Sequence, residues 1–284
     1  MTAAFKVSGG GNDFLALVEP EREPLADEIR AWCTRGLSFG ADGLFTIRRP
    51  GEAETDRDVT MRYWNSDGRT AALCINGTRC AARLALELGW TNDRFRIATD
   101  AGTFGAHAVQ PTEIALHLPA PADWPRKKLL EIDGREIAGW FVTVGVPHYV
   151  VVWPTSLRDA PVDELGAKIR WHAEFAPAGT NVDFVRFPDR NAMEIRSYER
   201  GVEAETLACG TGTLASVAVG LQLDLAELPV VATTRGGFAL TVDGETVDAA
   251  LRSWTLAGDA RLLGTIEIRP EAGIPAPAAP RWSD

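Results

Sequence analysis

Two cysteines stand in nearly the same setting, and their chemistry suits proton transfer. Cys74 precedes Ile75-Asn76-Gly77-Thr78, and Cys209 precedes Gly210-Thr211-Gly212-Thr213; the two cysteines are 135 positions apart. An apolar helical stretch follows each, so each cysteine is expected at a helix N-terminus, where unpaired N–H groups and the helix dipole favour negative charge. That setting lowers a cysteine pKa toward the reactive thiolate. Two such thiols facing one ligand from opposite sides could move a proton from one face of a carbon to the other.

The cysteine segments belong to an internal repeat that spans about half of the chain. The same offset pairs Gly10 with Gly145, Asp13 with His148, Phe14 with Tyr149, Tyr63 with Tyr198, and Leu86 with Leu221. A chain of 284 residues with 45% hydrophobic residues is large enough for two cores. The repeat therefore predicts two related domains.

Each half has the pattern of short strands plus one apolar helix. The helices predicted over 78–88 and 213–223 are apolar on nearly every side, which is typical of buried helices. We predict an α+β fold of two pseudo-symmetric domains, each a barrel-like, mostly antiparallel sheet around a central helix. The Pro-rich segment 119–125 is the predicted linker, and residues 271–284 are a predicted disordered tail.

The composition excludes several classes of partner. The net charge is −10 and no basic stripe is interleaved with aromatic residues, so neither nucleic acid nor an anionic membrane is an expected partner. The first twenty residues do not resemble a signal peptide, and the longest apolar stretch is too short to cross a bilayer. We expect a cytoplasmic protein with reduced thiols and, because the cysteine and histidine spacings lack zinc-ligand pairs, no metal.

Other interpretations of these residues stay open at this point. Cys33 and Cys80 fall on apolar helical faces and are interpreted as structural. The segment 209–213 loosely matches a phosphate-binding loop but lacks its lysine. The chain could also be a non-catalytic amino-acid binder, or a redox sensor in which Cys74 and Cys209 form a reversible disulfide.

The order of several motifs resembles the diaminopimelate epimerase family, whose members are cofactor-independent amino-acid epimerases. The matching segments are Gly11-Asn12-Asp13-Phe14, Ala41-Asp42-Gly43-Leu44, Asn65 to Gly68, Cys74-x-Asn76-Gly77-x-Arg79-Cys80, Gly145-x-Pro147-His148, Asn181, and Tyr198-Glu199-Arg200-Gly201 with Glu205-Thr206-x-Ala208-Cys209-Gly210. They span residues 5–268. The resemblance implies domains of residues 1–119 with a returning strand within 262–270, and of residues 120–261.

The resemblance also implies roles for individual residues. Cys74 and Cys209 would be the acid/base pair, acting as one thiolate and one thiol. The backbone N–H groups of Ile75, Asn76, Gly210 and Thr211 would hold the reacting carboxylate, and Asn12 would touch the same end of the substrate. Asn65, Asn181 and Arg200 would bind the distal end, and His148 and Glu199 would position the amino groups. The family needs no cofactor and is usually a homodimer.

Without the family, these positions have simpler interpretations. Arg200 could be a solvated surface charge, Asn65 and Asn181 could be turn residues, and His148 could be a core histidine.

Two departures from the family pattern bear on the substrate. Ile75 replaces the usual glycine of C-G-N-G, and Val146 replaces the asparagine of G-N-P-H. Both make the pocket more apolar and leave the thiols in place. Because Arg200, Asn65 and Asn181 are retained, the leading hypothesis is conversion of LL-diaminopimelate to the meso form for lysine and peptidoglycan synthesis. A racemase of another amino acid, such as histidine, is the alternative, and a proline racemase ranks third.

Overall fold

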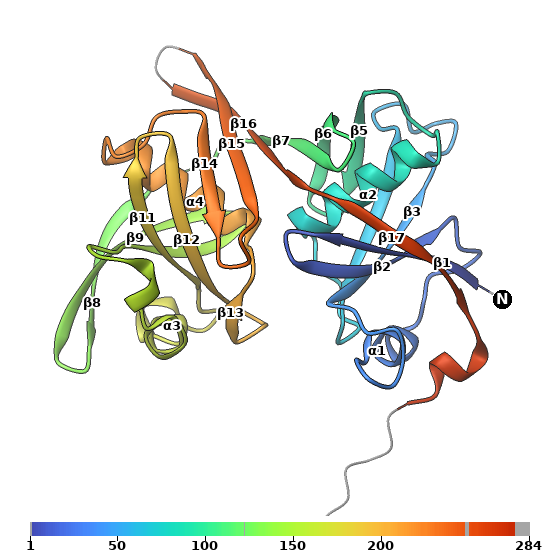
Figure 1. The fold of residues 1–284 in the computed structure, drawn as a ribbon, viewed down its shortest axis with the longest axis horizontal. Helices are drawn as coiled ribbons and strands as arrows, with labels where there is room; N and C mark the ends of the chain where they lie inside the picture. The colour runs from blue at the N-terminus through green and yellow to red at the C-terminus, as the bar shows by residue number, and fades with distance from the viewer. Residues whose placement is uncertain (1, 122, 248–249, 276–284) are drawn as a thin grey trace, which may run out of the picture. The chain divides into compact units, whose positions relative to one another are not determined.

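The computed structural model describes residues 2–121, 123–247 and 250–275 and divides the chain into two compact units (Figure 1). Unit 1 contains the residues up to Thr103 and the described residues from Arg261 onward. Unit 2 contains Phe104–Ala260. No helix among the described residues is long and apolar enough to cross a membrane.

Unit 1 is a mixed sheet with helix α2 packed on one face. Its elements are β1 (Thr2–Gly9), β2 (Asn12–Val18), α1 (Ala26–Cys33), β3 (Gly43–Arg48), β4 (Val59–Asn65), α2 (Ile75–Glu87), β5 (Arg94–Thr99), β17 (Arg261–Ile268) and η3 (Pro270–Gly273). The strands pair in the order β17-β1-β2-β3-β4-β5, with β2–β3 and β4–β5 parallel. Helix α2 contacts β1, β2, β3, β4 and β17.

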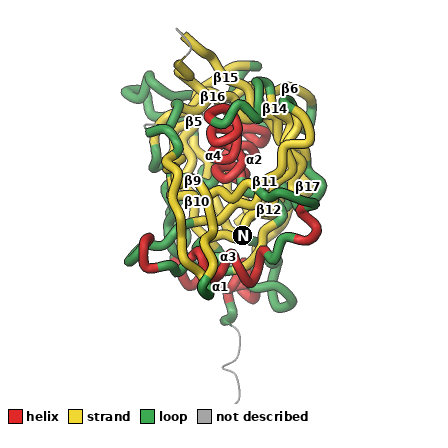
Figure 2. Tube along the Cα trace, turned by 90° about the vertical axis from the view of Figure 1, so that its left-hand side faces the viewer, coloured by secondary structure: helices red, strands yellow, loops and turns green. Residues whose placement is uncertain are grey.

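Unit 2 follows the same plan around α4. After β6 (Gly102–Gln110), its elements are β7 (Glu113–Pro119), β8 (Arg126–Ile132), β9 (Arg135–Val144), β10 (Val146–Val152), η1 (Leu157–Asp159), α3 (Val162–Arg170), η2 (Ala173–Phe175), β11 (Asn181–Asp189), β12 (Ala192–Glu199), β13 (Ala204–Thr206), α4 (Gly210–Gln222), β14 (Val230–Thr234), β15 (Ala239–Val247) and β16 (Ala250–Asp259). Helix α4 contacts β9, β10, β11, β15 and β16, and Figure 2 shows it with strands on either side. In the described part of this unit, β10 pairs with β11 and β12 with β14 in parallel.

The described residues of the predicted linker belong to unit 2. Strand β7 pairs with β16 over seven positions, from Glu113↔Asp259 to Pro119↔Ser253, and this ladder joins residues before the linker to unit 2. Residues 276–284 of the predicted tail lie outside the described residues. Its first residues belong to η3, which contacts α1.

The strands that correspond in the two units are paired in the same relative register. In unit 1 the row Leu15↔Leu44↔Trp64 faces the core cluster that contains α1, and in unit 2 the row Tyr149↔Val182↔Tyr198 faces the cluster that contains α3. Because side chains alternate along a strand, their neighbours point to the other face, toward α2 and α4. These inward positions are Phe14, Phe45 and Tyr63 in unit 1 and His148, Asp183 and Ser197 in unit 2.

The predicted fold class is confirmed: two pseudo-symmetric units, each a mixed sheet around a buried helix. On β2 and β10 the structural equivalence differs by one position from the constant 135-residue offset. Phe14 corresponds to His148, whereas the offset pairs Phe14 with Tyr149. The equivalence is defined by which residues face the core clusters beside α1 and α3, and not by distance along the sequence.

Candidate active site

Cys74 is the N-cap residue of α2, as the sequence predicts. Its backbone is extended (φ −129°, ψ 104°), and its sulfur accepts a hydrogen bond from the Gly77 N–H at 3.5 Å. Its carbonyl accepts from the Thr78 N–H at 2.7 Å and from the Thr78 hydroxyl at 2.9 Å. The side chain is half-buried and the cysteine is free. The thiol therefore lies at the positive end of the helix, within reach of solvent.

Tyr63 is a partner of Cys74 that the sequence did not reveal. Burial raises the pKa of Tyr63 well above its usual value, and the charge of Cys74 and a hydrogen bond between the two side chains raise it further. The phenol is therefore protonated at neutral pH and donates to the sulfur. A donor at this place stabilises the thiolate form of Cys74.

Tyr63→Phe is expected to raise the pH at which the Cys74 thiol titrates, by about half to one unit, because one hydrogen bond is worth roughly 1 kcal/mol. The titration is measured from the Cβ resonance of [3-¹³C]cysteine-labelled protein. Tyr198→Phe is the matched control, since Tyr198 is the sequence counterpart but packs in the core cluster beside α3. An unchanged Cys74 titration in Tyr63→Phe would contradict the assigned hydrogen bond.

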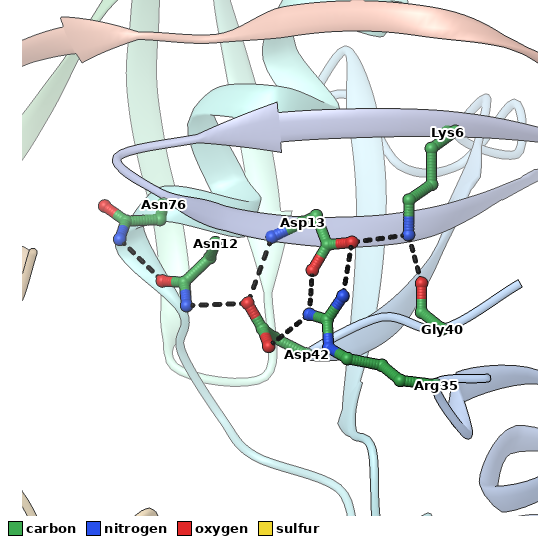
Figure 3. Close-up of polar contacts among 7 residues, drawn as sticks. All are labelled: Lys6, Asn12, Asp13, Arg35, Gly40, Asp42 and Asn76. Carbon is green, nitrogen blue, oxygen red and sulfur yellow. Dashed lines mark hydrogen bonds and ion pairs between the residues drawn. The ribbon is translucent and has the colours of Figure 1, made fainter. Parts of the chain in front are cut away.

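A chain of polar contacts brings Asn12 together with Asn76, which lies two residues after Cys74 in the sequence (Figure 3). The Asn76 amide donates to Asn12 Oδ1 at 2.8 Å, and the Asn12 amide donates to Asp42 Oδ2 at 3.1 Å. Buried Arg79 donates to Asn76 Oδ1 at 2.7 Å. These contacts define which amide atom of each asparagine is the oxygen. The network therefore holds the Asn12 and Asn76 side chains in single orientations.

Two basic side chains anchor the other end of this network. Arg35 pairs with Asp42 at 2.8 Å and also with Asp13, and Lys6 lies 2.6 Å from Asp13. Burial acts to raise the pKa of Asp13, but hydrogen bonds from Arg35 and Lys6 hold it below its usual value. The Asp13 carboxylate thus stays ionised, and its ion pairs, together with that between Arg35 and Asp42, keep the loop before β3 in place.

Ile75 and Asn65 lie at the two ends of the segment that connects β4 to α2. Ile75 is the first residue of α2 and is 5% exposed, so it needs no left-handed backbone conformation, and its side chain packs inward. The substitution of the family glycine therefore adds no backbone strain. Asn65 ends β4 and is exposed, with its backbone N–H bonded to the Arg69 carbonyl at 2.9 Å.

Cys209 repeats the geometry of Cys74 at the start of α4 but in a drier setting. Its backbone is extended (φ −113°, ψ 112°), and its sulfur accepts from the Gly212 N–H at 3.3 Å and lies 3.5 Å from the Thr211 hydroxyl. Burial raises the pKa of the Cys209 thiol well above its usual value, and the charges of Glu199 and Asp183 raise it further. The prediction of a lowered pKa is therefore wrong for Cys209, because burial and two carboxylates outweigh the helix end.

Glu199 is the acid beside Cys209. Burial raises the pKa of Glu199 above its usual value, whereas hydrogen bonds from the Thr206 hydroxyl, at 2.5 Å, and from the Cys209 thiol lower it. The thiol donates to the carboxylate, so the two groups form a proton-sharing pair at the end of β12. Thr206 is a member of the site that we did not single out from the sequence.

Glu199→Gln is expected to move the Cys209 titration to lower pH. The negative charge of Glu199 raises the pKa of this thiol, so its removal must lower that pKa. The Cβ resonance of labelled Cys209 reports the shift. Glu227→Gln, at an exposed acid in the same unit, is the control and should leave the titration unchanged. An upward shift in Glu199→Gln would overturn the assigned coupling.

His148, on β10, is fully buried and lies 2.7 Å from Asp183 Oδ2 through Nδ1. Asp183 Oδ1 also accepts from the Ser197 hydroxyl at 2.6 Å. Asp183 was missed in the sequence; the signal was its place two residues after Asn181, which puts both side chains on one face of β11.

Asn181 and Arg200 meet through the backbone. Asn181 is buried, pairs in register with His148, and accepts the Arg200 N–H through Oδ1 at 2.7 Å. Within the described residues, the half-buried guanidinium of Arg200 has no hydrogen bond or ion pair. Asn181 is thus a fixed structural contact, and Arg200 keeps its charge available.

Comparison with known proteins gives the family. The model of the diaminopimelate epimerase family matches residues 4–115 and 140–252. A diaminopimelate epimerase of Aquifex aeolicus is 38% identical over 251 residues, covering 84% of this chain and 88% of that protein. One from Chlorobaculum tepidum is 31% identical and covers 96% of each chain. The chain belongs to the diaminopimelate epimerase family. It is therefore an isomerase.

Solved structures show the same fold at low sequence identity. A probable proline racemase from Agrobacterium radiobacter K84 superposes with a TM-score of 0.73 at 14% identity, covering 96% of both chains. A hydroxyproline epimerase from Agrobacterium vitis gives 0.65 at 16% identity, covering 96% of this chain and 94% of that one. The fold of the diaminopimelate epimerase family is thus shared with these proteins.

The two cysteines lie in different surroundings. Half-buried Cys74 has a phenol donor, whereas buried Cys209 has a carboxylate partner. The two sulfurs share the helix N-cap position but have different hydrogen-bond partners. Within the described residues, no group of three or more His, Cys, Asp or Glu side chains is placed to hold a metal ion.

Proposed function

We propose that this isomerase converts LL-2,6-diaminopimelate to meso-diaminopimelate by two-base proton transfer. One cysteine thiolate takes the α-proton, the electron pair passes into the α-carboxylate, and the other cysteine thiol delivers its proton to the opposite face of the carbon. The carrying observation is that Cys74 and Cys209 occupy the same N-cap position at two buried helices in a member of this family. The roles exchange when the reaction runs backward.

The helix ends support stabilisation of the charge that develops on the substrate. The first N–H groups of α2 and α4 have no carbonyl partner within their helices, and they belong to Ile75, Asn76, Gly210 and Thr211. When the α-proton leaves, negative charge grows on the carboxylate oxygens. Removing one such donor from an acyl-transfer site costs about 2.7–4 kcal/mol, so donors of this kind can supply much of the catalysis.

Arg200 supports recognition of a second carboxylate. Its half-buried guanidinium has no ion-pair partner in the part of the chain that the structure describes, and guanidinium groups bind carboxylates in a bidentate manner. We assign Asn65 and Asn181 to the same distal end, with His148 and Glu199 near the amino groups. A substrate with carboxylates at both ends fits this set.

A racemase of another amino acid, such as histidine, is the second candidate, and one structural observation favours it. Val146 occupies on β10 the place that Asn12 occupies on β2, because Phe14 corresponds to His148. Unit 2 therefore lacks the amide that unit 1 has at this position. A smaller or more apolar distal group would suit Val146 and Ile75.

We further propose that the protein works as a cytoplasmic homodimer without a cofactor, in lysine and peptidoglycan precursor synthesis. The relatives named above are diaminopimelate epimerases, which supports the pathway. Sedimentation velocity of the purified chain tests the dimer.

The test of function is proton NMR in D₂O with reduced protein. LL-diaminopimelate, L-histidine, L-lysine and L-proline are added separately, and loss of each α-proton signal is followed. Exchange with LL-diaminopimelate alone, together with appearance of the meso form, is the expected result. Exchange with another amino acid would replace the substrate, and no exchange with any of them would leave amino-acid binding or thiol redox sensing as the function.

A further inference from the structure

Three buried polar side chains lie between the sheet of unit 2 and the start of α4. They are His148 on β10, Asp183 on β11 and Ser197 on β12, and all are at most 3% exposed. Asp183 joins them, with His148 Nδ1 at 2.7 Å from Oδ2 and the Ser197 hydroxyl at 2.6 Å from Oδ1. Asp183 has no part in the reaction as proposed above.

The same three positions in unit 1 are aromatic. Phe14 lies 6.1 Å from the Phe45 ring and 6.0 Å from the Tyr63 ring, measured between centroids. The register of the two sheets makes Phe14 equivalent to His148, Phe45 to Asp183, and Tyr63 to Ser197. Since unit 1 builds the same fold with three aromatic side chains at these positions, the fold does not require His148, Asp183 and Ser197 there. Burying such groups is costly, so a function must retain them.

Asp183 is held by contacts with two strands and with α4. Both oxygens accept hydrogen bonds, and the group lies against the first turn of α4. A Cβ added to Gly212 would overlap Asp183 Oδ1 and come within 2.9 Å of its Cγ. The positive end of the helix dipole stabilises a negative charge at that place. A carboxylate oxygen accepts hydrogen bonds, so with Asp183 Oδ2 as the acceptor, His148 Nδ1 is the donor of their shared hydrogen bond.

The other nitrogen of His148 has no hydrogen bond. Nε2 is buried and without a partner among the described residues. If the ring carried its proton on Nε2, that proton would be a buried donor without an acceptor. The contacts therefore favour the tautomer with the proton on Nδ1 and a lone pair on Nε2.

We propose that Asp183 is a positioning residue that holds His148 as the Nδ1–H tautomer, so that Nε2 presents a lone pair to the ammonium group of a bound amino acid. The identity of that donor rests on the proposed function, whereas the tautomer does not. Outer partners that orient a functional histidine typically contribute 10- to 100-fold, as seen at metal sites.

The test is NMR of protein labelled with [¹⁵N]histidine, recorded at a pH about one unit above the usual histidine pKa of about 6.5. The chain has only four histidines, and His148→Asn assigns the signal. We expect Nδ1–H in the wild type and loss of this tautomer in Asp183→Leu. Asp183→Asn keeps an acceptor without the charge and should give a mixture, and Ser197→Ala should keep the tautomer.

Kinetics on the preferred amino acid complete the test. Asp183→Leu should lose about 10- to 100-fold in kcat/KM, with a smaller loss in Asp183→Asn. A wild-type His148 with its proton on Nε2, or an unchanged tautomer in Asp183→Asn and Asp183→Leu, would overturn the proposal. If the tautomer depends on Asp183 but no variant, including the wild type, turns over an amino acid, the positioning role stands and the proposed function fails.

Discussion

Replacing either Cys74 or Cys209 by alanine is expected to reduce epimerisation of LL-diaminopimelate by at least about a thousandfold. Each substitution removes one partner of the proton transfer, and a positioned acid or base contributes roughly 10²- to 10⁴-fold. Both side chains are at N-caps, so loss of the thiol also removes the sulfur that accepts from Gly77 or Gly212. Because sulfur is a weak acceptor, the helices should persist.

Cys33→Ala is the matched control for these variants. Cys33 is buried in α1, and burial raises the pKa of its thiol to about 12, so it stays protonated and takes no part in proton transfer. The epimerase activity of the Cys33→Ala variant should stay within a few-fold of the wild-type activity. Circular dichroism and the melting temperature check that each variant is folded. Inversion at near wild-type rate in a folded Cys74→Ala or Cys209→Ala protein would refute the two-base mechanism.

Gly212→Ala is expected to lower the free energy of unfolding by about 2–4 kcal/mol. The new methyl group would overlap Asp183 Oδ1, and this carboxylate cannot swing away because His148 and Ser197 hold it in a buried site. Without that overlap, alanine would favour the helix by roughly 1 kcal/mol. The effect therefore reports the contact between α4 and Asp183.

Gly77→Ala is the matched control, since Gly77 has the same place in α2. A Cβ there meets only the flexible end of Met61, at 3.4 Å, and Cys74 Sγ, at 3.5 Å. The free energy of unfolding from urea titrations should be unchanged or higher by up to about 1 kcal/mol. In the background of Asp183→Ala, Gly212→Ala should cost much less. An equal cost in both backgrounds would show that Asp183 is not the obstacle.

The duplicated cysteine segments predicted the architecture of this protein correctly. Each segment has a cysteine, then small residues, then an apolar stretch. This local pattern alone is enough to predict a helix N-terminus. The helices begin at Ile75 and Gly210, three residues before the predicted start, because the cysteines themselves are the N-caps. The family followed from spaced motifs that the comparisons confirm.

The partners of the two thiols could not be predicted, because they come from distant strands. Tyr63 reaches Cys74 from β4, and Glu199 reaches Cys209 from β12, so only the sheet register brings them together. The constant offset aligned Tyr63 with Tyr198, yet the structure places Tyr198 on the opposite face of its sheet. A shift of one residue along a strand reverses the face, and sequence distance does not define that shift.

Local pattern and motif order are enough to predict the fold class, the family and the two helix-capping thiols. The pKa of Cys209 depends instead on residues that only folding brings together. Burial and the carboxylates of Glu199 and Asp183 raise the pKa of Cys209, against the effect of its helix end. Such shifts arise from desolvation and from charges on neighbouring strands, and neither quantity exists until the sheet closes around its helix.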